Sequence, residues 1–209
     1  MKRFFIMSIA VLGLFILAAC GVMGDKVDGN VYEKIHRQLM GMESFTAQAT
    51  VTYITNNTTI TYETLQHARK TGEYRIQVTY PSNVAGNTTV FDGAVISQFN
   101  PHVHDHIAQT TIESPERLEI LLTSFVRNYS ICQEASVTAT TIDESLTTVL
   151  EAAIPGEHPY LSFARLWVSN DSLLPQKMTI YDVQGVERVI VVYNSFEFNS
   201  RLEDSIFRP

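Results

Sequence analysis

The sequence predicts an α+β domain in which one long, curved antiparallel sheet lies over two or more helices. Two segments place apolar residues at helical spacing, and many short segments alternate apolar and polar residues or are rich in β-branched residues. Turn-forming pairs such as Asn56-Asn57, Asp92-Gly93 and Gln184-Gly185 separate the β segments. Because a sheet must bury at least one face, the apolar sides of the helices are its expected cover.

The first helix is predicted to begin at Asn30 and to end near Gly41–Ser44. Asn30 and Glu33 have the spacing of a capping box, in which two side chains satisfy free backbone N–H groups at the start of a helix. The apolar residues that fall on one face of this helix are Val31, Ile35, Leu39 and Met42.

The second helix is predicted over Pro115–Tyr129. Ser114 provides the cap, and Pro115 occupies the first position, where the missing N–H has no partner to lose. Its apolar face is wide enough to be covered along most of one side. We expect a hydrophobic ligand or partner surface formed by part of this face and a tryptophan of a later strand, namely Leu118, Leu121, Leu122, Phe125 and Trp167. The alternative for Trp167 is packing in the core.

The β segments begin at Phe45, where the period of apolar residues changes to two. Pro81 ends one of them, and Asp92-Gly93 predicts a tight hairpin between two others. The predicted strands are Phe45–Tyr53, Thr58–Gln66, Tyr74–Tyr80, Thr88–Phe91, Val95–Phe99, Ile131–Ala139, Thr147–Ile154, Tyr160–Ser169, Gln176–Tyr181 and Glu187–Phe198.

Residues 1–19 are expected to be an export signal. Lys2 and Arg3 precede an apolar stretch from Phe4 to Ala19, and Leu17-Ala18-Ala19-Cys20 resembles the bacterial lipobox. The alternative is an uncleaved membrane helix, but the stretch is shorter than the roughly 20 residues that a bilayer requires. We therefore expect cleavage before Cys20, lipidation of its thiol, and attachment to the outer face of the cell membrane. Residues 20–29 then form a short tether, and residues 30–209 form the domain.

The charge of the chain disfavours nucleic-acid binding. Removal of the first 19 residues leaves 190 residues with 13 basic and 22 acidic side chains, a formal charge of −9, and no run of Lys or Arg. Neutralising phosphates requires a basic patch, which this chain lacks. An acidic protein is also not drawn to anionic lipid by charge, so the lipid on Cys20 is the expected attachment.

The order of several short motifs resembles the LolA/LolB superfamily of lipoprotein carriers and their relatives. These motifs include Gly72-Glu73-Tyr74-Arg75-Ile76, Tyr80-Pro81, Phe91-Asp92-Gly93, Leu166-Trp167-Val168, Leu174-Pro175-Gln176-Lys177 and Phe196-Glu197-Phe198-Asn199. The resemblance covers about Val31 to Phe207 and implies an unclosed β-barrel with helices in its concavity.

The lipobox sets the chain apart from the soluble carriers, because a diffusible shuttle is not anchored. The chain is more similar to the lipidated GerS-like germination lipoproteins. That resemblance implies a non-enzymatic binding or scaffold protein of sporulation or germination whose partner is a cell-wall (cortex) amidase. The alternative is a carrier or sensor that binds a lipid or acyl chain in the half-barrel.

Catalytic chemistry is not evident in the sequence, and no cofactor is expected. His102, His104 and His106 would share one side of an extended segment and could bind Zn²⁺ or Cu²⁺, but a solvent-exposed polar loop is the simpler explanation, since no second cluster of ligands is visible. Cys132 could be a nucleophile, but lone cysteines are more often buried apolar residues. After lipidation of Cys20 it is the one remaining thiol, so no internal disulfide is expected.

Two further features of the strands carry predictions. Arg75 and Arg165 stand within apolar strands; we interpret them as surface arginines, the alternative being that they hold an interior helix closed. The segment Arg188–Phe198 is apolar on both faces, so its second face needs a cover. The tail Ser200–Pro209 is the first candidate for that cover, and a second copy of the chain, giving a homodimer, is another.

Overall fold

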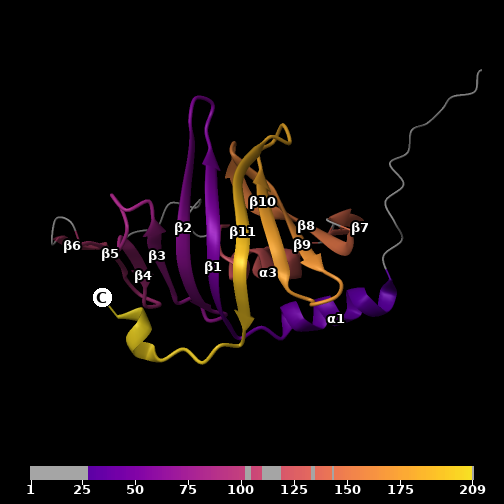
Figure 1. Ribbon diagram of the computed structural model, residues 1–209, viewed down its shortest axis with the longest axis horizontal. Coiled ribbons are helices and arrows are strands. Elements are labelled where there is room, and N and C mark those ends of the chain that lie inside the picture. The colour runs from indigo at the N-terminus through magenta and orange to yellow at the C-terminus, as the bar shows by residue number, and fades with distance from the viewer. Residues whose placement is uncertain (1–27, 102–104, 110–118, 133–134, 143, 209) are drawn as a thin grey trace, which may run out of the picture.

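The computed structural model describes residues 28–101, 105–109, 119–132, 135–142 and 144–208 (Figure 1). Two α-helices, eleven strands and a short 3₁₀ helix lie within these ranges. Their bounds are α1 Gly29–Met40, β1 Ser44–Ile54, β2 Thr59–Arg69, β3 Tyr74–Tyr80, β4 Thr88–Phe91, β5 Ile96–Asn100, β6 Asp105–Gln109, α3 Leu122–Ile131, β7 Ser136–Ile142, β8 Ser145–His158, β9 Leu161–Ser169, β10 Pro175–Tyr181, β11 Glu187–Phe198 and η1 Asp204–Phe207.

All eleven strands form one antiparallel sheet in the order β6-β5-β4-β3-β2-β1-β11-β10-β9-β8-β7. Neighbours in the sheet are neighbours in sequence except at the centre, where β1 pairs with β11 from Phe45↔Phe198 to Tyr53↔Val189. Strands β6 and β7 stand at opposite ends of this order, so the sheet curves without closing. This confirms the predicted α+β class with an unclosed barrel.

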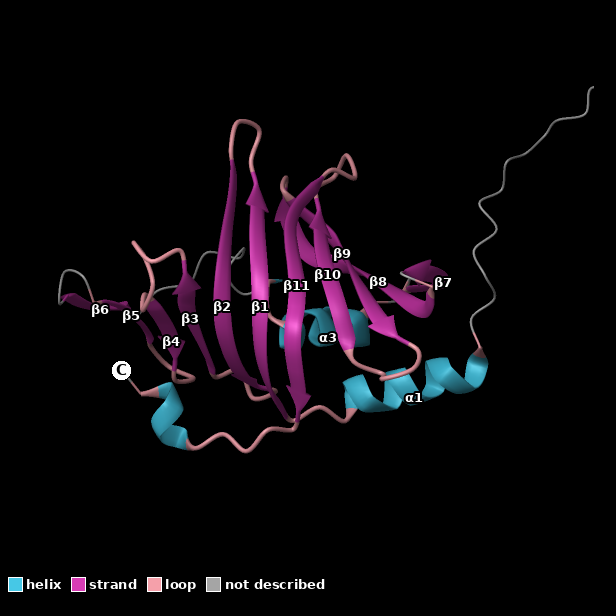
Figure 2. Cartoon of the chain, in the orientation of Figure 1, coloured by secondary structure: helices cyan, strands magenta, loops and turns pink. Residues whose placement is uncertain are grey.

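The two helices lie on the concave side and at one edge of the sheet (Figure 2). Helix α1 begins one residue before the predicted start, and Asp28 rather than Asn30 is its cap: the Asp28 carboxylate accepts a 2.9 Å hydrogen bond from the backbone N–H of Asn30. Helix α3 continues to Ile131, so the strand predicted from Ile131 begins only at Ser136. The prediction of one continuous helix over Pro115–Tyr129 is wrong, because Leu121 has an extended backbone and α3 begins only at Leu122. The predicted start at Ser114-Pro115 lies outside the described residues.

The core lies between the concave face of the sheet and the helices. Along β1 every second residue points into it, with Phe45, Ala47, Ala49 and Val51 at most 1% exposed. Ile35 and Leu39 of α1 and Leu122 and Phe125 of α3 complete the same cluster. The two helices also meet directly, because the hydroxyl oxygens of Tyr32 and Tyr129 lie 3.1 Å apart.

The C-terminal segment folds back under the sheet, but not where the sequence indicated. It leaves the end of β11 and runs past the ends of β1, β2 and β3 (Figure 1). The Arg69 guanidinium binds it by donating to the carbonyl of Leu202 at 2.6 Å, by pairing with Asp204 at 2.8 Å and by lying 4.7 Å over the ring of Phe207. The outer face of β11 is therefore not covered by the tail, and Val192 remains 41% exposed.

Candidate functional site

A cavity of about 390 Å³ opens where the strands end on the side of the sheet opposite α1. Three turns meet there: the β1–β2 turn (55–58), the β8–β9 turn (159–160) and the β10–β11 turn (182–186), which together we call the hairpin edge. The opposite edge, along which α1 and the C-terminal segment run, is the helix edge (Figure 1). The cavity, or rim pocket, is lined by Tyr53, Ile54, Thr55, Asn56, Asn57, Tyr160, Leu161, Arg188 and Val189.

Arg188 connects all three turns of the hairpin edge. Its guanidinium pairs with the Asp182 carboxylate at 2.6 Å and donates to the side-chain oxygen of Asn56 at 2.9 Å. The same group lies 5.2 Å from the ring centre of Tyr160, within the range of a cation–π contact. One side chain from the start of β11 thereby fixes the relative positions of the turns around the pocket.

Asp182 supplies the balancing charge from a fully buried position. Burial opposes ionisation of this carboxyl, but hydrogen bonds from the backbone N–H groups of Val186 and Gln184 and the charge of Arg188 outweigh it and hold the pKa of Asp182 below its usual value. The pair is thus ionised at neutral pH, and the pocket carries no net charge from it. An uncharged, largely apolar group fits these walls best.

The described residues offer little for catalysis or metal binding. They contain no group of three His, Cys, Asp or Glu side chains that could hold a metal ion. His102 and His104 lie outside the described residues. The backbone of His106 belongs to β6, opposite Phe99 of β5, in an edge strand that the sequence patterns did not reveal. A metal site at these histidines therefore stays a prediction, as does lipidation of Cys20, which also lies outside the described residues.

Two further side chains bear on chemistry. Cys132 is a free thiol, partly buried against the core at the end of α3. Glu119 is 8% exposed and accepts a 2.8 Å hydrogen bond from the side-chain amide of Asn128. Burial raises the pKa of the Glu119 carboxyl, against the opposing effects of Arg127 and Asn128. These contacts tie Glu119 to the following helix.

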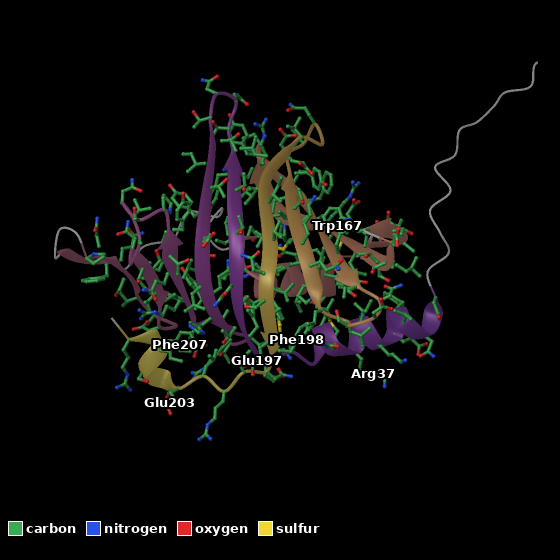
Figure 3. All side chains as sticks on the ribbon, in the orientation of Figure 1. Arg37, Trp167, Glu197, Phe198, Glu203 and Phe207 are labelled. Carbon is green, nitrogen blue, oxygen red and sulfur yellow. The ribbon has the colours of Figure 1, made fainter. Side chains whose placement is uncertain are left out.

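The predicted hydrophobic surface does not come together on one face. Leu121, Leu122 and Phe125 are at most 2% exposed and form core under the concave side of the sheet. Trp167 lies on the other face of β9, under the Lys177 ammonium at 4.7 Å (Figure 3). Leu118 lies outside the described residues. Binding of a ligand or partner by these residues stays a prediction.

Arg165 and Arg75 lie on the outer face, as the surface interpretation of the sequence has it. Arg165 donates to Glu151 at 2.6 Å and lies over the rings of Phe163 and Tyr181. Arg75 donates to the carbonyl of Ile206 in the C-terminal segment at 3.5 Å. These contacts bind strand to strand and strand to tail, rather than an interior helix.

The rim pocket itself was missed by sequence reasoning, because its residues come from turns far apart in the chain. The sequence does mark the β10–β11 turn of the hairpin edge as unusual, because Val183 and Val186 flank Gln184-Gly185 there. Apolar residues in a tight surface turn have no local role, since such turns favour Gly, Asn, Asp and Ser.

Residues 1–207 match the protein family described as sporulation protein YdcC-like. The chain belongs to this family. Among the helices that the structure describes, none in this YdcC-like chain is long and apolar enough to cross a membrane. No curated protein resembles the sequence significantly.

Solved structures with a similar fold extend the comparison. A chain in the structure of the CwlD amidase from Clostridioides difficile in complex with the GerS lipoprotein is 26% identical, with a TM-score of 0.50, and the match covers 84% of the YdcC-like chain and 98% of that chain. This confirms the resemblance to GerS. An uncharacterized conserved protein from Thermus thermophilus has a TM-score of 0.53 at 10% identity, over 86% and 92% of the two chains. The LolA superfamily protein NE2245 from Nitrosomonas europaea has a TM-score of 0.43 at 15% identity, over 86% and 96%.

Proposed function

We propose that this protein is a membrane-anchored, extracytoplasmic lipoprotein of sporulation that binds a cell-wall amidase without catalysing a reaction itself. The observation that carries the proposal is the similarity to a chain of the GerS–CwlD complex, which extends over 98% of that chain. Membership of a sporulation family supports the same process.

The geometry favours binding over catalysis. The concave side of the sheet is packed against α3, and the rim pocket joins apolar walls to an ion pair whose charges cancel. Among the residues that the structure describes, neither arrangement brings a nucleophile next to a base, which covalent catalysis requires. What both offer is shape and apolar area for a partner.

Co-purification from sporulating cells tests the proposal. The full-length chain, carrying a C-terminal tag and solubilised in detergent, is expected to retain a cell-wall amidase in near-equal amount, identified by mass spectrometry. A strain lacking the chain is expected to lose the amidase products from its spore cortex. Normal cortex cleavage in that strain, with no amidase retained by the tagged chain, would refute the proposal.

The anchor is tested separately at Cys20. In the Cys20→Ala variant the chain should fail to incorporate labelled acyl groups and should accumulate as a larger precursor. A matched Cys132→Ala variant should label normally, because Cys132 lies in the folded domain at the end of α3. Normal acyl labelling of Cys20→Ala would exclude lipidation at this residue.

Two alternatives make different predictions for the purified protein. A carrier or sensor of acyl chains would retain lipid, which native mass spectrometry detects as added mass. A homodimer would show twice the mass in solution at high concentration. Helix α3 packs on the concave side, as the helices of the carriers do, so the measured mass of the purified protein decides between the scaffold and the carrier.

A further inference from the structure

We propose that the hairpin edge is the surface on which the protein partner docks, with an uncharged apolar segment of the partner inserted in the rim pocket. This inference rests on the proposed binding function and assigns it to one edge of the sheet. The partner segment is defined by its chemistry: an apolar or aromatic side chain flanked by backbone that can bond to the polar side chains of the β1–β2 turn.

Exposed apolar side chains gather at the hairpin edge, both in the wall of the pocket and in the adjoining β10–β11 turn. In the β10–β11 turn Val183 is 62% and Val186 46% exposed, and in the β8–β9 turn Tyr160 is 48% exposed. Ile60, 43% exposed, pairs across the strands with Tyr53, which lines the pocket. Single exposed apolar residues are ordinary, but a group of them on the three turns beside a cavity indicates a binding surface.

The turns that carry these residues are held in place before any partner arrives. Arg188 bonds to Asp182 and Asn56 and lies over Tyr160, so it links all three turns. Within the last turn, the Asp182 carboxylate also accepts 2.9 Å hydrogen bonds from the N–H groups of Gln184 and Val186. A surface fixed in advance loses less conformational entropy on binding, which favours affinity.

The charge at the pocket determines what can enter it. Arg188 is 13% and Asp182 1% exposed at their side chains, and the 2.6 Å pair neutralises both. A charged group entering beside them would have to give up its hydration without gaining a free counter-charge. An apolar group gives up nothing of this kind and gains contact with Leu161, Val189 and Tyr53.

The position of the edge favours a protein over a membrane lipid. The chain that precedes Asp28 joins the domain at α1, and α1 runs along the helix edge, opposite the hairpin edge (Figure 1). With Cys20 in the bilayer, the short tether holds the helix edge nearer to the membrane. The hairpin edge then faces the aqueous space, where a cell-wall enzyme is found.

A double variant with a matched control tests the assignment. Val183→Ser with Val186→Ser, introduced in the full-length tagged chain, should retain at least about tenfold less of the amidase that co-purifies from sporulating cells, because both apolar contacts are lost. Val192→Ser changes the same type of side chain at similar exposure on the outer face of β11, and should retain the amidase within about twofold of the unchanged chain. Thermal unfolding of each variant verifies that it folds.

The outcomes separate the surface from the function. An unchanged chain that retains no amidase contradicts the proposed function. An unchanged chain that retains the amidase, together with a folded double variant that retains it equally well, contradicts the hairpin edge alone. A lipid that co-purifies with the unchanged chain and disappears from the double variant, seen by native mass spectrometry, would overturn the protein occupant of the pocket.

Discussion

The helix edge and the hairpin edge of the same sheet differ in how far their apolar side chains are covered. At the helix edge, α1 meets α3 through Tyr32 and Tyr129, and the C-terminal segment buries Phe207 to 3% exposure against Arg69. At the hairpin edge, Val183 and Tyr160 are about half exposed or more, at 62% and 48%. Both edges therefore carry apolar residues, but within the described residues the chain itself covers only those of the helix edge.

The largest effect is expected in the core beneath the helix edge. Phe125 is 1% exposed and stacks on Tyr129 with ring centres 5.9 Å apart. Phe125→Ala should lower the free energy of unfolding by about 3–5 kcal/mol, since it removes a large buried side chain and leaves a cavity. Urea unfolding measures this. A loss below about 1 kcal/mol would mean that α3 contributes little to the core.

A smaller loss is expected where the C-terminal segment covers the sheet. Phe207→Ala should cost about 2 kcal/mol, because the ring is buried and contacts the Arg69 guanidinium (Figure 3). Phe99→Ala provides the control, since Phe99 is 42% exposed on β5 and should cost less than about 0.5 kcal/mol. Equal losses in urea unfolding would show that the segment is only loosely attached.

The helix edge should also respond to acid through His67. Half-burial, and then the charge of Arg75, lower the pKa of His67, while Thr46 lies 3.1 Å from its Nδ1. The unfolded chain therefore takes up a proton near pH 6.5 that the folded chain resists, and stability should fall as the pH drops below about 6.5.

His67→Gln keeps a hydrogen-bonding group beside Thr46 but removes this titration. The decrease in melting temperature between pH 7.5 and pH 5.5 should thus be smaller in the variant than in the unchanged protein. Identical decreases would show that His67 is equally easy to protonate in both states.

The smallest effect is expected at the hairpin edge. Val183→Ser should change the free energy of unfolding by less than about 0.5 kcal/mol, because the side chain is 62% exposed in the free protein. Thermal and urea unfolding measure it. A loss above about 1 kcal/mol would mean that Val183 supports the fold, and the difference between the two edges would no longer hold.

Local patterns in the sequence predicted where the strands lie better than they predicted the contacts between distant segments or the residues of the site. Alternation from Phe45 to Tyr53 and the Asp92-Gly93 turn report local geometry, and most strand bounds agree with the structure to within a few residues. Strand β6 was missed because the segment around His106 is mostly polar. The predicted strand Ile131–Ala139 begins too early, because Ile131 ends α3, with 63% of its surface exposed.

The site depended on contacts that no local pattern contains. Arg188 reaches Asn56, 132 positions earlier in the chain, and nothing in the sequence around either residue indicates the other. The same holds for the C-terminal segment. Its apolar Phe207 packs under Arg69, and nothing in the sequence near Phe207 indicates that strand as its partner. Residues that serve one turn or one strand were predictable, whereas residues that join distant turns were not.

Strand β11 pairs with both β1 and β10, so it joins the two halves of the sheet. Ser44 and Ser200, joined by a 2.7 Å hydrogen bond, are 156 positions apart, so this contact can form only after nearly all of the chain has been synthesised. Until then β1 and β10 each present an open edge, and two partial sheets exist where the mature protein has one. Such long-range closure is slow, and the waiting edges can recruit strands from other chains. A chain that stops before Glu187 would lack β11, so the edges of β1 and β10 would stay unpaired. A quality-control protease or chaperone could then recognise these exposed strand edges.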